Sequence, residues 1–221
     1  MKFRNIIMLS LLCCFGWITS CTPEEYEVDL SYGLTHAIAM YDGNENTGTF
    51  QFYKLLNRSM IDKGVSYDRT MDAILEATVP GGAGGEKYTV FVLQNDDVKD
   101  MSLTYFGKSA IELGTTTVTT RNKAFKLLQF YYVVGEYRVE NLPSKLKMDN
   151  GYEISISGNK LTGFSGTQVQ IVSGNNEARN GVFHVIDGPL HPVTTSSFVD
   201  YNTSYFYSYA TYEDKKEYNP Y

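Results

Sequence analysis

The chain carries a histidine and an aspartate, His184 and Asp187, whose types could support general acid–base chemistry. Residues 182–186 are a run of branched and aromatic side chains that follows the turn signal Asn180-Gly181, and this pattern predicts a strand that contains His184 and is followed by Asp187. A strand rises about 3.3 Å per residue and alternates its faces, so the two side chains would lie about 10 Å apart on opposite faces. They cannot act as a base and its orienting partner. A histidine among apolar neighbours is instead predicted to be a hydrogen-bonded core residue.

Other patterns that approach a catalytic or binding motif fail on their spacing. Residues 42–46 begin like a calcium loop, but Thr47 and Tyr53 stand where that loop needs Gly and Glu. Residues 80–85 are rich in glycine, yet no Gly-Lys-Ser/Thr follows them as a phosphate loop requires. Residues 163–166 do not complete a Gly-x-Ser-x-Gly elbow, and the three histidines do not form a His-Glu-x-x-His pattern. We therefore predict no catalytic residue, no metal site, no cofactor, no small-molecule substrate and no enzymatic activity.

Residues 1–20 have the pattern of a targeting segment. Lys2 and Arg4 precede an apolar stretch over residues 6–18, which is too short for a membrane span of about 20 residues. The Ile-Thr-Ser that precedes Cys21 resembles the lipobox of bacterial lipoproteins, and that resemblance implies cleavage before Cys21 and its acylation. The alternative is an ordinary secretory signal with Cys21 incidental.

Residues 21–45 are predicted to be a lipidated N-terminus and spacer, which includes an acidic cluster at residues 24–27. Such a cluster resembles the surface-export signal of some Gram-negative lipoproteins, so we expect an outer-membrane protein that faces the surface, with a periplasmic-facing location as the alternative. Without Lys2 and Arg4, 17 basic residues face 25 acidic residues, a net charge of −8. An acidic chain argues against a nucleic-acid partner. No cysteine follows Cys21, so no disulfide is expected in the folded part.

Periodicity predicts a mixture of helices and strands after the spacer. Phe52, Leu55 and Leu56 fall on one helical face, and a second helical pattern runs from Ser66 to Leu75. Residues 115–120 favour either a strand or an exposed loop. The stretches with strand patterns, separated by Gly and Asn turns, are residues 88–93, 152–157, 169–172 and 182–186.

Two segments resemble the signatures of fasciclin (FAS1) domains. Residues 180–192 agree with the second signature at nine positions, namely Asn180, Gly181, Val182, His184, Val185, Ile186, Asp187, Leu190 and Pro192. Residues 89–98 resemble the first signature, with matches at Thr89, Val90, Phe91 and Asn95. Asn95 and Asp96 are typical helix N-caps, so we expect a structural role for them.

A third segment, residues 127–135, resembles the family's Leu-Leu-x-Tyr-His-Val-Val stretch. Tyr131 falls on the family's tyrosine, whereas Tyr132 replaces its histidine. In animal members this region is implicated in integrin-dependent adhesion, and the substitution weakens that inference here. The resemblance covers residues 46–192 and implies an α+β fold: a wedge-shaped β-sandwich of two sheets with short helices along one edge.

The implied function is adhesion, or binding of a protein or glycan partner, by a membrane-anchored domain. Two alternatives remain, a fimbrial or structural surface subunit and an accessory glycan-binding lipoprotein of an uptake system. The Tyr-rich extension, residues 193–221, places Tyr205, Tyr207 and Tyr209 at strand period. It is predicted to pack on the domain as an extra strand or strap, and the alternative is an exposed aromatic strip for a partner.

Overall fold

The computed structural model describes residues 32–41, 47–60, 70–76 and 87–191 of the chain. The expected leader, most of the spacer and the Tyr-rich extension lie outside these ranges. The helices of the described part are α1 (Leu34–Met40), α2 (Phe50–Arg58), α3 (Met71–Leu75), α4 (Asn95–Phe106) and α5 (Val118–Leu128), with 3₁₀ turns η1 (Glu112–Thr115) and η2 (Val139–Asn141). The strands are β1 (Tyr88–Leu93), β2 (Tyr132–Val134), β3 (Lys145–Lys147), β4 (Glu153–Ser157), β5 (Lys160–Thr162), β6 (Gln168–Ala178) and β7 (Gly181–Ile186).

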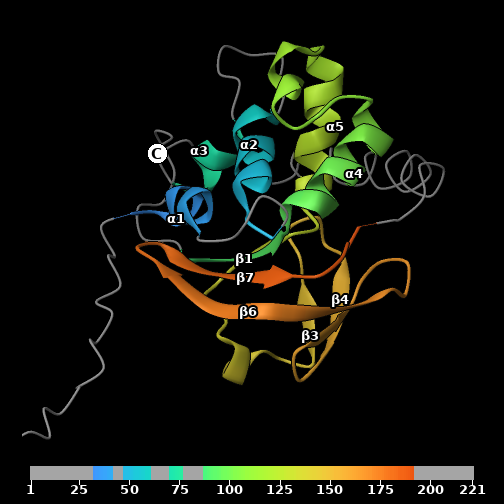
Figure 1. Ribbon diagram of the computed structural model, residues 1–221. Helices are drawn as coiled ribbons and strands as arrows, with labels where there is room; N and C mark the ends of the chain where they lie inside the picture. Colours follow the sequence, from blue (N-terminus) through green and yellow to red (C-terminus); the bar gives the residue numbers. More distant parts are fainter. Residues whose placement is uncertain (1–31, 42–46, 61–69, 77–86, 192–221) are drawn as a thin grey trace, which may run out of the picture.

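These strands form one mixed sheet in the order β2-β1-β7-β6-β5-β4-β3. Only the β1–β7 pair among them is parallel. Strand β6 pairs with β5 through its first residues and with β7 through the rest, with register shifts between Ile171 and Asn176. Such bulges bend a strand, and the sheet curls around β6 into a nearly closed barrel (Figure 1). The predicted division into two sheets is therefore not confirmed, because β6 belongs to both halves.

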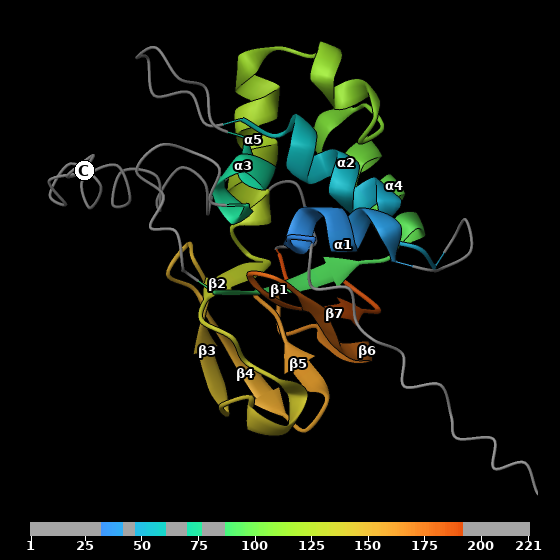
Figure 2. The ribbon, with the colours of Figure 1, turned by 90° about the vertical axis from the view of Figure 1, so that its left-hand side faces the viewer.

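The helices lie together on one side of the barrel, next to β1 and β7 (Figures 1 and 2). Helix α2 buries Phe52, Leu55 and Leu56, as their spacing predicted. Helix α3 buries Met71 and Leu75, while the start of its predicted pattern lies outside the described residues. None of the helices described is both long enough and apolar enough to cross a membrane.

Strands β1 and β7 form the centre of the molecule. Every residue of both strands is buried, because the helices cover one face and the rest of the barrel covers the other. Their register pairs Tyr88 with Gly181 and Leu93 with Ile186, so the two segments that resemble family signatures lie side by side. The prediction of a strand at residues 182–186 that is buried on both faces is confirmed.

The prediction of a strand or loop at residues 115–120 is wrong. This stretch contains the end of η1 and the start of α5, with Thr117 as the N-cap. The Thr117 hydroxyl accepts a hydrogen bond from the Thr120 N–H at 3.3 Å. Threonine favours strands in isolation, but its hydroxyl also caps helices, and here burial of Phe125 and Leu128 fixes the helical outcome.

Candidate functional site

The turn that leads into β7 is built around Asn180 and Gly181. The Asn180 Oδ1 accepts from the Leu34 N–H at 2.8 Å, and its Nδ2 donates to the Leu75 carbonyl. One amide side chain thus ties the start of α1 and the end of α3 to the sheet. Gly181 has a φ of +148°, and a Cβ there would overlap the Tyr88 carbonyl oxygen. Both residues therefore have a structural role, because neither presents an unbonded group to a ligand.

His184 is completely buried and holds a fixed tautomer. Its Nε2–H donates to the Tyr137 carbonyl at 2.8 Å, and its Nδ1 accepts from the Asn175 N–H at 3.1 Å. Burial lowers the pKa of His184, although the hydrogen bond to Tyr137 and the nearby Glu140 carboxylate act in the opposite direction. With both ring nitrogens bonded to main chain, His184 is a structural link and not a general base.

Asn175 completes this arrangement from the bulge of β6. It has a left-handed φ of 57°. Its Oδ1 accepts from the Val139 N–H at 2.8 Å, and its Nδ2 donates to Glu140 at 2.9 Å. Sequence reasoning missed Asn175, although Gly174-Asn175-Asn176 carries the turn residues that mark a bulge.

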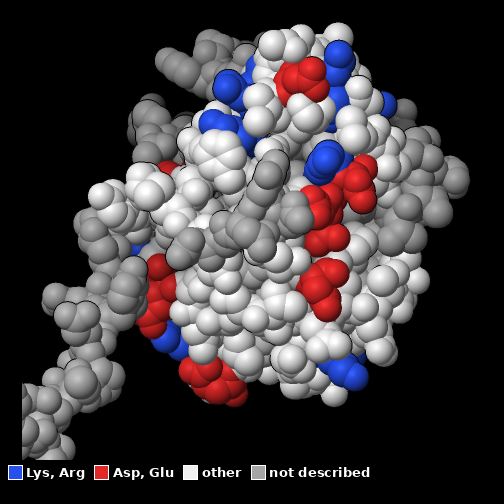
Figure 3. Space-filling model, viewed as in Figure 1, with Lys and Arg blue, Asp and Glu red and all other residues white. Residues whose placement is uncertain are grey.

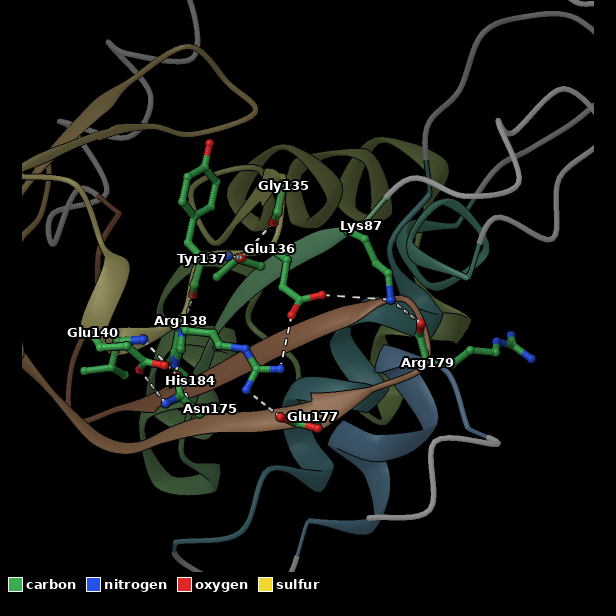
Figure 4. A network of polar contacts seen from close by, with 12 residues as sticks. Lys87, Gly135, Glu136, Tyr137, Arg138, Glu140, Asn175, Glu177, Arg179 and His184 are labelled. Atoms are coloured by element: carbon green, nitrogen blue, oxygen red, sulfur yellow. Dashed lines mark hydrogen bonds and ion pairs between the residues drawn. The ribbon is translucent and has the colours of Figure 1, made fainter. Parts of the chain in front are cut away.

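Charged side chains extend the same network across the surface (Figure 4). Arg138 pairs with Glu177 at 2.5 Å and with Glu136 at 3.2 Å. Lys87 lies 3.9 Å from Glu136 and donates to the Arg179 carbonyl at 2.7 Å. The hydrogen bond and charge of Glu177 raise the pKa of Arg138. Because these pairs are exposed to water, each contributes little to the stability of the fold, and the network presents mixed charge to a partner.

Asn95 caps a helix other than its own. Gln94 is the N-cap of α4, whereas the Asn95 Oδ1 accepts from the Gln51 N–H of α2 at 2.8 Å. Asp96 lies exposed in the first turn of α4, where its charge favours the helix dipole. Neither residue is therefore the N-cap of α4, although Asn95 has a structural role as the cap of α2. The first signature joins β1 to α2 by a contact 44 residues away in the sequence.

Asp187 follows β7 and fixes its end to β6. Its Oδ1 accepts from the Gln170 N–H at 2.6 Å, and its N–H donates to the Gln170 carbonyl at 3.1 Å. Its carboxylate therefore extends the ladder beyond Ile186. No hydrogen bond or ion pair joins it to His184 among the described contacts.

Tyr131 and His191 form a buried polar pair beneath the helices. The Tyr131 hydroxyl accepts from the Leu190 N–H at 3.3 Å and is bonded to the His191 Nδ1. Burial raises the pKa of Tyr131 well above its usual value and lowers the pKa of His191 to about 3. Tyr132, which replaces the family's histidine, is buried and meets the Tyr88 ring edge-on at 6.3 Å. Neither tyrosine presents a surface for adhesion.

The His191 environment predicts a loss of stability in mild acid. The pKa of His191 is 6.5 when unfolded and about 3 when folded. Its stabilising contribution is therefore complete above pH 6.5 and is lost as the pH falls toward 3. The expected loss is about 2 kcal/mol between pH 6.5 and about pH 5, where ordinary carboxylates contribute little. Chemical denaturation at several pH values measures it. His191→Gln, which keeps an acceptor for Tyr131, should flatten this slope, and an equally steep slope in that variant would contradict the assignment.

The described surface has two notable hollows. The smaller, of about 180 Å³, lies beside α4 and is lined by Leu93, Asp97, Asp100, Met101, Thr104, Tyr105, Pro189 and His191. Burial raises the pKa of Asp97, with further contributions from Asp187, Asp100 and Asp96. Acidic side chains gather beside α4 in Figure 3. This hollow disfavours anionic ligands, and no three His, Cys, Asp or Glu side chains in the described ranges could hold a metal ion.

The larger hollow is a groove of about 440 Å³ between β2 and β3. Its lining residues are Val133, Val134, Tyr137, Pro143, Lys145, Leu146, Lys147, Met148 and Asp149. It contains exposed apolar and basic side chains, which suit a peptide better than a small polar molecule. No local sequence pattern predicts this groove, because it arises where two strands that are distant in the sequence approach each other.

The remaining predicted site residues, Cys21, Tyr205, Tyr207 and Tyr209, lie outside the described part of the chain. Of the predicted residues that are described, Asn180, Gly181 and His184 lie close together at β7, whereas Asn95 and Tyr131 lie on other elements. Each of these five residues contacts the main chain or the core of the domain.

Comparison with known proteins identifies a family for this chain. The family model described as the fasciclin domain matches residues 52–192. The search of curated proteins found no match. A solved structure of a FAS1 domain pair from the insect cell adhesion molecule Fasciclin I aligns with a TM-score of 0.43 and 15% identity, over 65% of this chain and 46% of that chain. The chain thus covers about half the length of that two-domain structure.

Proposed function

The chain belongs to the fasciclin domain family, and on this premise we propose that it is a membrane-anchored envelope lipoprotein that binds a protein or glycan partner without turnover. The family match over residues 52–192 is the observation that carries the proposal. Fasciclin domains are associated with adhesion or binding. The nearly closed barrel, with its helices along one side, would present its loops and helices to that partner.

The described side chains support a binding role over a catalytic one. The histidines of the core, His184 and His191, have bonded ring nitrogens, and burial lowers the pKa of each. A general base needs a pKa near the working pH and access to its substrate. The buried histidines meet neither condition, whereas the outer surface carries mixed charge suited to a macromolecular partner.

The proposed anchor is a lipid on Cys21, which would hold the protein at the outer membrane facing the cell surface. Three acyl chains would give stable anchoring, because one chain alone binds only marginally and each buried CH₂ adds about 0.8 kcal/mol. The acidic residues 24–27 support surface export by their position just after Cys21.

Cys21→Ala should remove the lipid and release the protein from membranes. Cells fed a clickable palmitate analogue should label the wild-type chain but not this variant, and fractionation should move the variant to the soluble pool. Cys14→Ala, inside the expected leader, is the matched control and should keep both the label and the membrane fraction. Label on Cys21→Ala would refute the anchor.

The binding role is tested with the purified full chain on a glycan array and against surface-labelled cells. We expect saturable capture of one ligand class and no chemical change in that ligand. A variant that cannot fold, Val185→Asp, serves as the control for non-specific adsorption. Equal capture by the folded and unfolded chains, or no capture by either, would contradict the proposal. A glycan ligand would favour the accessory-uptake alternative, whereas self-assembly into fibres would favour the structural subunit.

A further inference from the structure

The curled sheet leaves a seam between its two edge strands, β2 and β3. At one end the Asp149 N–H donates to the Tyr132 carbonyl at 3.0 Å and joins the two edges. Beyond that bond the strands separate, and the groove of about 440 Å³ opens between Val134 and Lys145. The seam is the place where the barrel stops short of closing (Figure 2).

Main-chain groups of β3 point into this groove. The Ser144 carbonyl and the Met148 N–H bond to the β4 side, to Ile156 and Tyr152 at 2.8 and 2.7 Å. Because the hydrogen-bonding direction alternates along an antiparallel ladder, Lys145 and Lys147 direct their N–H and C=O groups away from β4. No described residue hydrogen-bonds to these main-chain groups. The β3 edge therefore offers two donors and two acceptors at the spacing that an added strand uses.

The opposite wall is apolar and exposed. Val134 of β2 is 52% exposed, and Val133 and Tyr137 line the groove beside it. Lysines and short length protect an edge strand from pairing with foreign chains, and β3 has both, with three residues and two exposed lysines. Such an edge beside an apolar wall suits a strand from the same chain. Because that strand is covalently tethered, its effective concentration at the edge is high, whereas strands of other molecules remain disfavoured.

The chain leaves the described domain close to this seam. His191 is bonded to Tyr131, which directly precedes β2, so the exit lies at the joined end of the seam. Thirty residues, 192–221, follow it, whereas the groove from Asp149 to Lys145 needs only about 13 Å of extended chain. Residues 198–212 contain Phe198, Val199 and the alternating Tyr205, Tyr207 and Tyr209, a composition that favours strands.

We propose that the C-terminal segment 198–212 lies in this groove and pairs as an eighth strand with the outer edge of β3. The pairing would cover Val134 and use the main-chain groups of Lys145 and Lys147. It would close the seam and hold the tyrosines against the domain, which makes residues 198–212 a structural part of the barrel. The inference concerns the fold of the full chain and does not depend on the identity of the adhesion partner.

Hydrogen–deuterium exchange of the full chain, resolved to single amides, tests the proposal. The Lys145 and Lys147 amides should exchange at least about tenfold more slowly than free peptide, together with alternate amides of residues 198–212. Truncation after Pro192 should remove that protection at Lys145 and Lys147 while the Leu146 and Met148 amides, which face β4, stay protected. It should also lower the melting temperature. Free-peptide exchange at Lys145 and Lys147 in the full chain would overturn the proposal.

Two substitutions keep the test decisive if the truncated chain fails to fold. Lys147→Pro removes an outward N–H that does not bond to β4, so residues 198–212 should become rapidly cleavable by chymotrypsin. Lys147→Thr is the matched control, because it keeps the N–H, and it should leave residues 198–212 protected. Tyr207→Pro should have the same effect from the segment's side. A protected tail with an unprotected β3 edge would mean that the tail packs elsewhere and would refute the pairing. Protection that grows with protein concentration would mean a second copy supplies the strand, which also refutes it.

Discussion

Val185→Asp is expected to abolish folding. Val185 lies in β7 with 1% exposure, between Val92 of β1 and Ser173 of β6. It shares a strand face with Phe183, whose ring meets Tyr41 edge-on at 5.8 Å, so the helix layer covers that face. A carboxylate there would have no cationic partner among these neighbours. An unpaired buried charge is among the few single changes that cost more than about 4 kcal/mol, a large part of a domain's total stability.

The measurement is a thermal melt followed by circular dichroism, with Val172→Asp as the matched control. Val172 lies in β6 and is 51% exposed, so the same substitution there leaves the charge in water. We expect that control to stay within about 0.5 kcal/mol of wild type. A Val185→Asp melt close to wild type would mean that the central strand is not buried between two layers.

The central strands and the helical faces were the most predictable parts of the fold. Residues 182–186 were predicted as a strand because the turn signal before them and their apolar run are local properties, and the spacing of Phe52, Leu55 and Leu56 predicted α2 for the same reason. The resemblance to the family signatures further indicated that residues 89–98 and 180–192 belong to the same domain. The structure supplies the physical link, which is the parallel register of β1 and β7.

The closure of the sheet could not be predicted from local patterns. It depends on the length and bending of β6, whose Asn175 adopts a left-handed conformation and bonds both η2 and His184. Periodicity identifies which residues face inward but says nothing about which strands share a ladder. The expectation of two sheets is not confirmed for this reason, and the groove between β2 and β3 is a consequence of the same curvature.

Contacts between distant residues limited the prediction of the candidate site. Asn95 was predicted to be a helix N-cap, but the helix that it caps is α2, whose Gln51 N–H lies 44 residues away in the sequence and donates to the Asn95 side chain. Tyr131 was considered for adhesion from its motif, yet its hydroxyl is bonded to His191, 60 residues away. Sequence motifs identified residues that matter, while the structure assigns most of them to holding the domain together.

Gly181→Ala is expected to be the most damaging conservative change in the chain. Gly181 has a φ of +148°, a conformation that costs an L-residue, and its Cβ position is occupied by the main chain of Tyr88. The Tyr88 N–H donates to the Asn180 carbonyl at 3.0 Å, so β1 cannot move away without breaking the start of the β1–β7 ladder. Backbone strain and overpacking of this kind each cost about 1–3 kcal/mol, and we expect a total loss above about 3 kcal/mol.

Gly158→Ala is the reference for a positive φ without a steric overlap. Gly158 also has a positive φ, +60°, but a Cβ there meets nothing within 4 Å. It should therefore lose only the conformational part, about 1–2 kcal/mol, in urea denaturation. The excess loss in Gly181→Ala then measures the overlap with Tyr88 together with the larger backbone cost of a φ of +148°. If the two variants lose the same stability, neither that backbone conformation nor the close approach of β1 to β7 requires glycine, and the Asn-Gly of this signature would be explained by its turn alone. If Gly181→Ala loses clearly more, the glycine is needed for its backbone conformation and because the carbonyl of β1 occupies the space of its missing side chain.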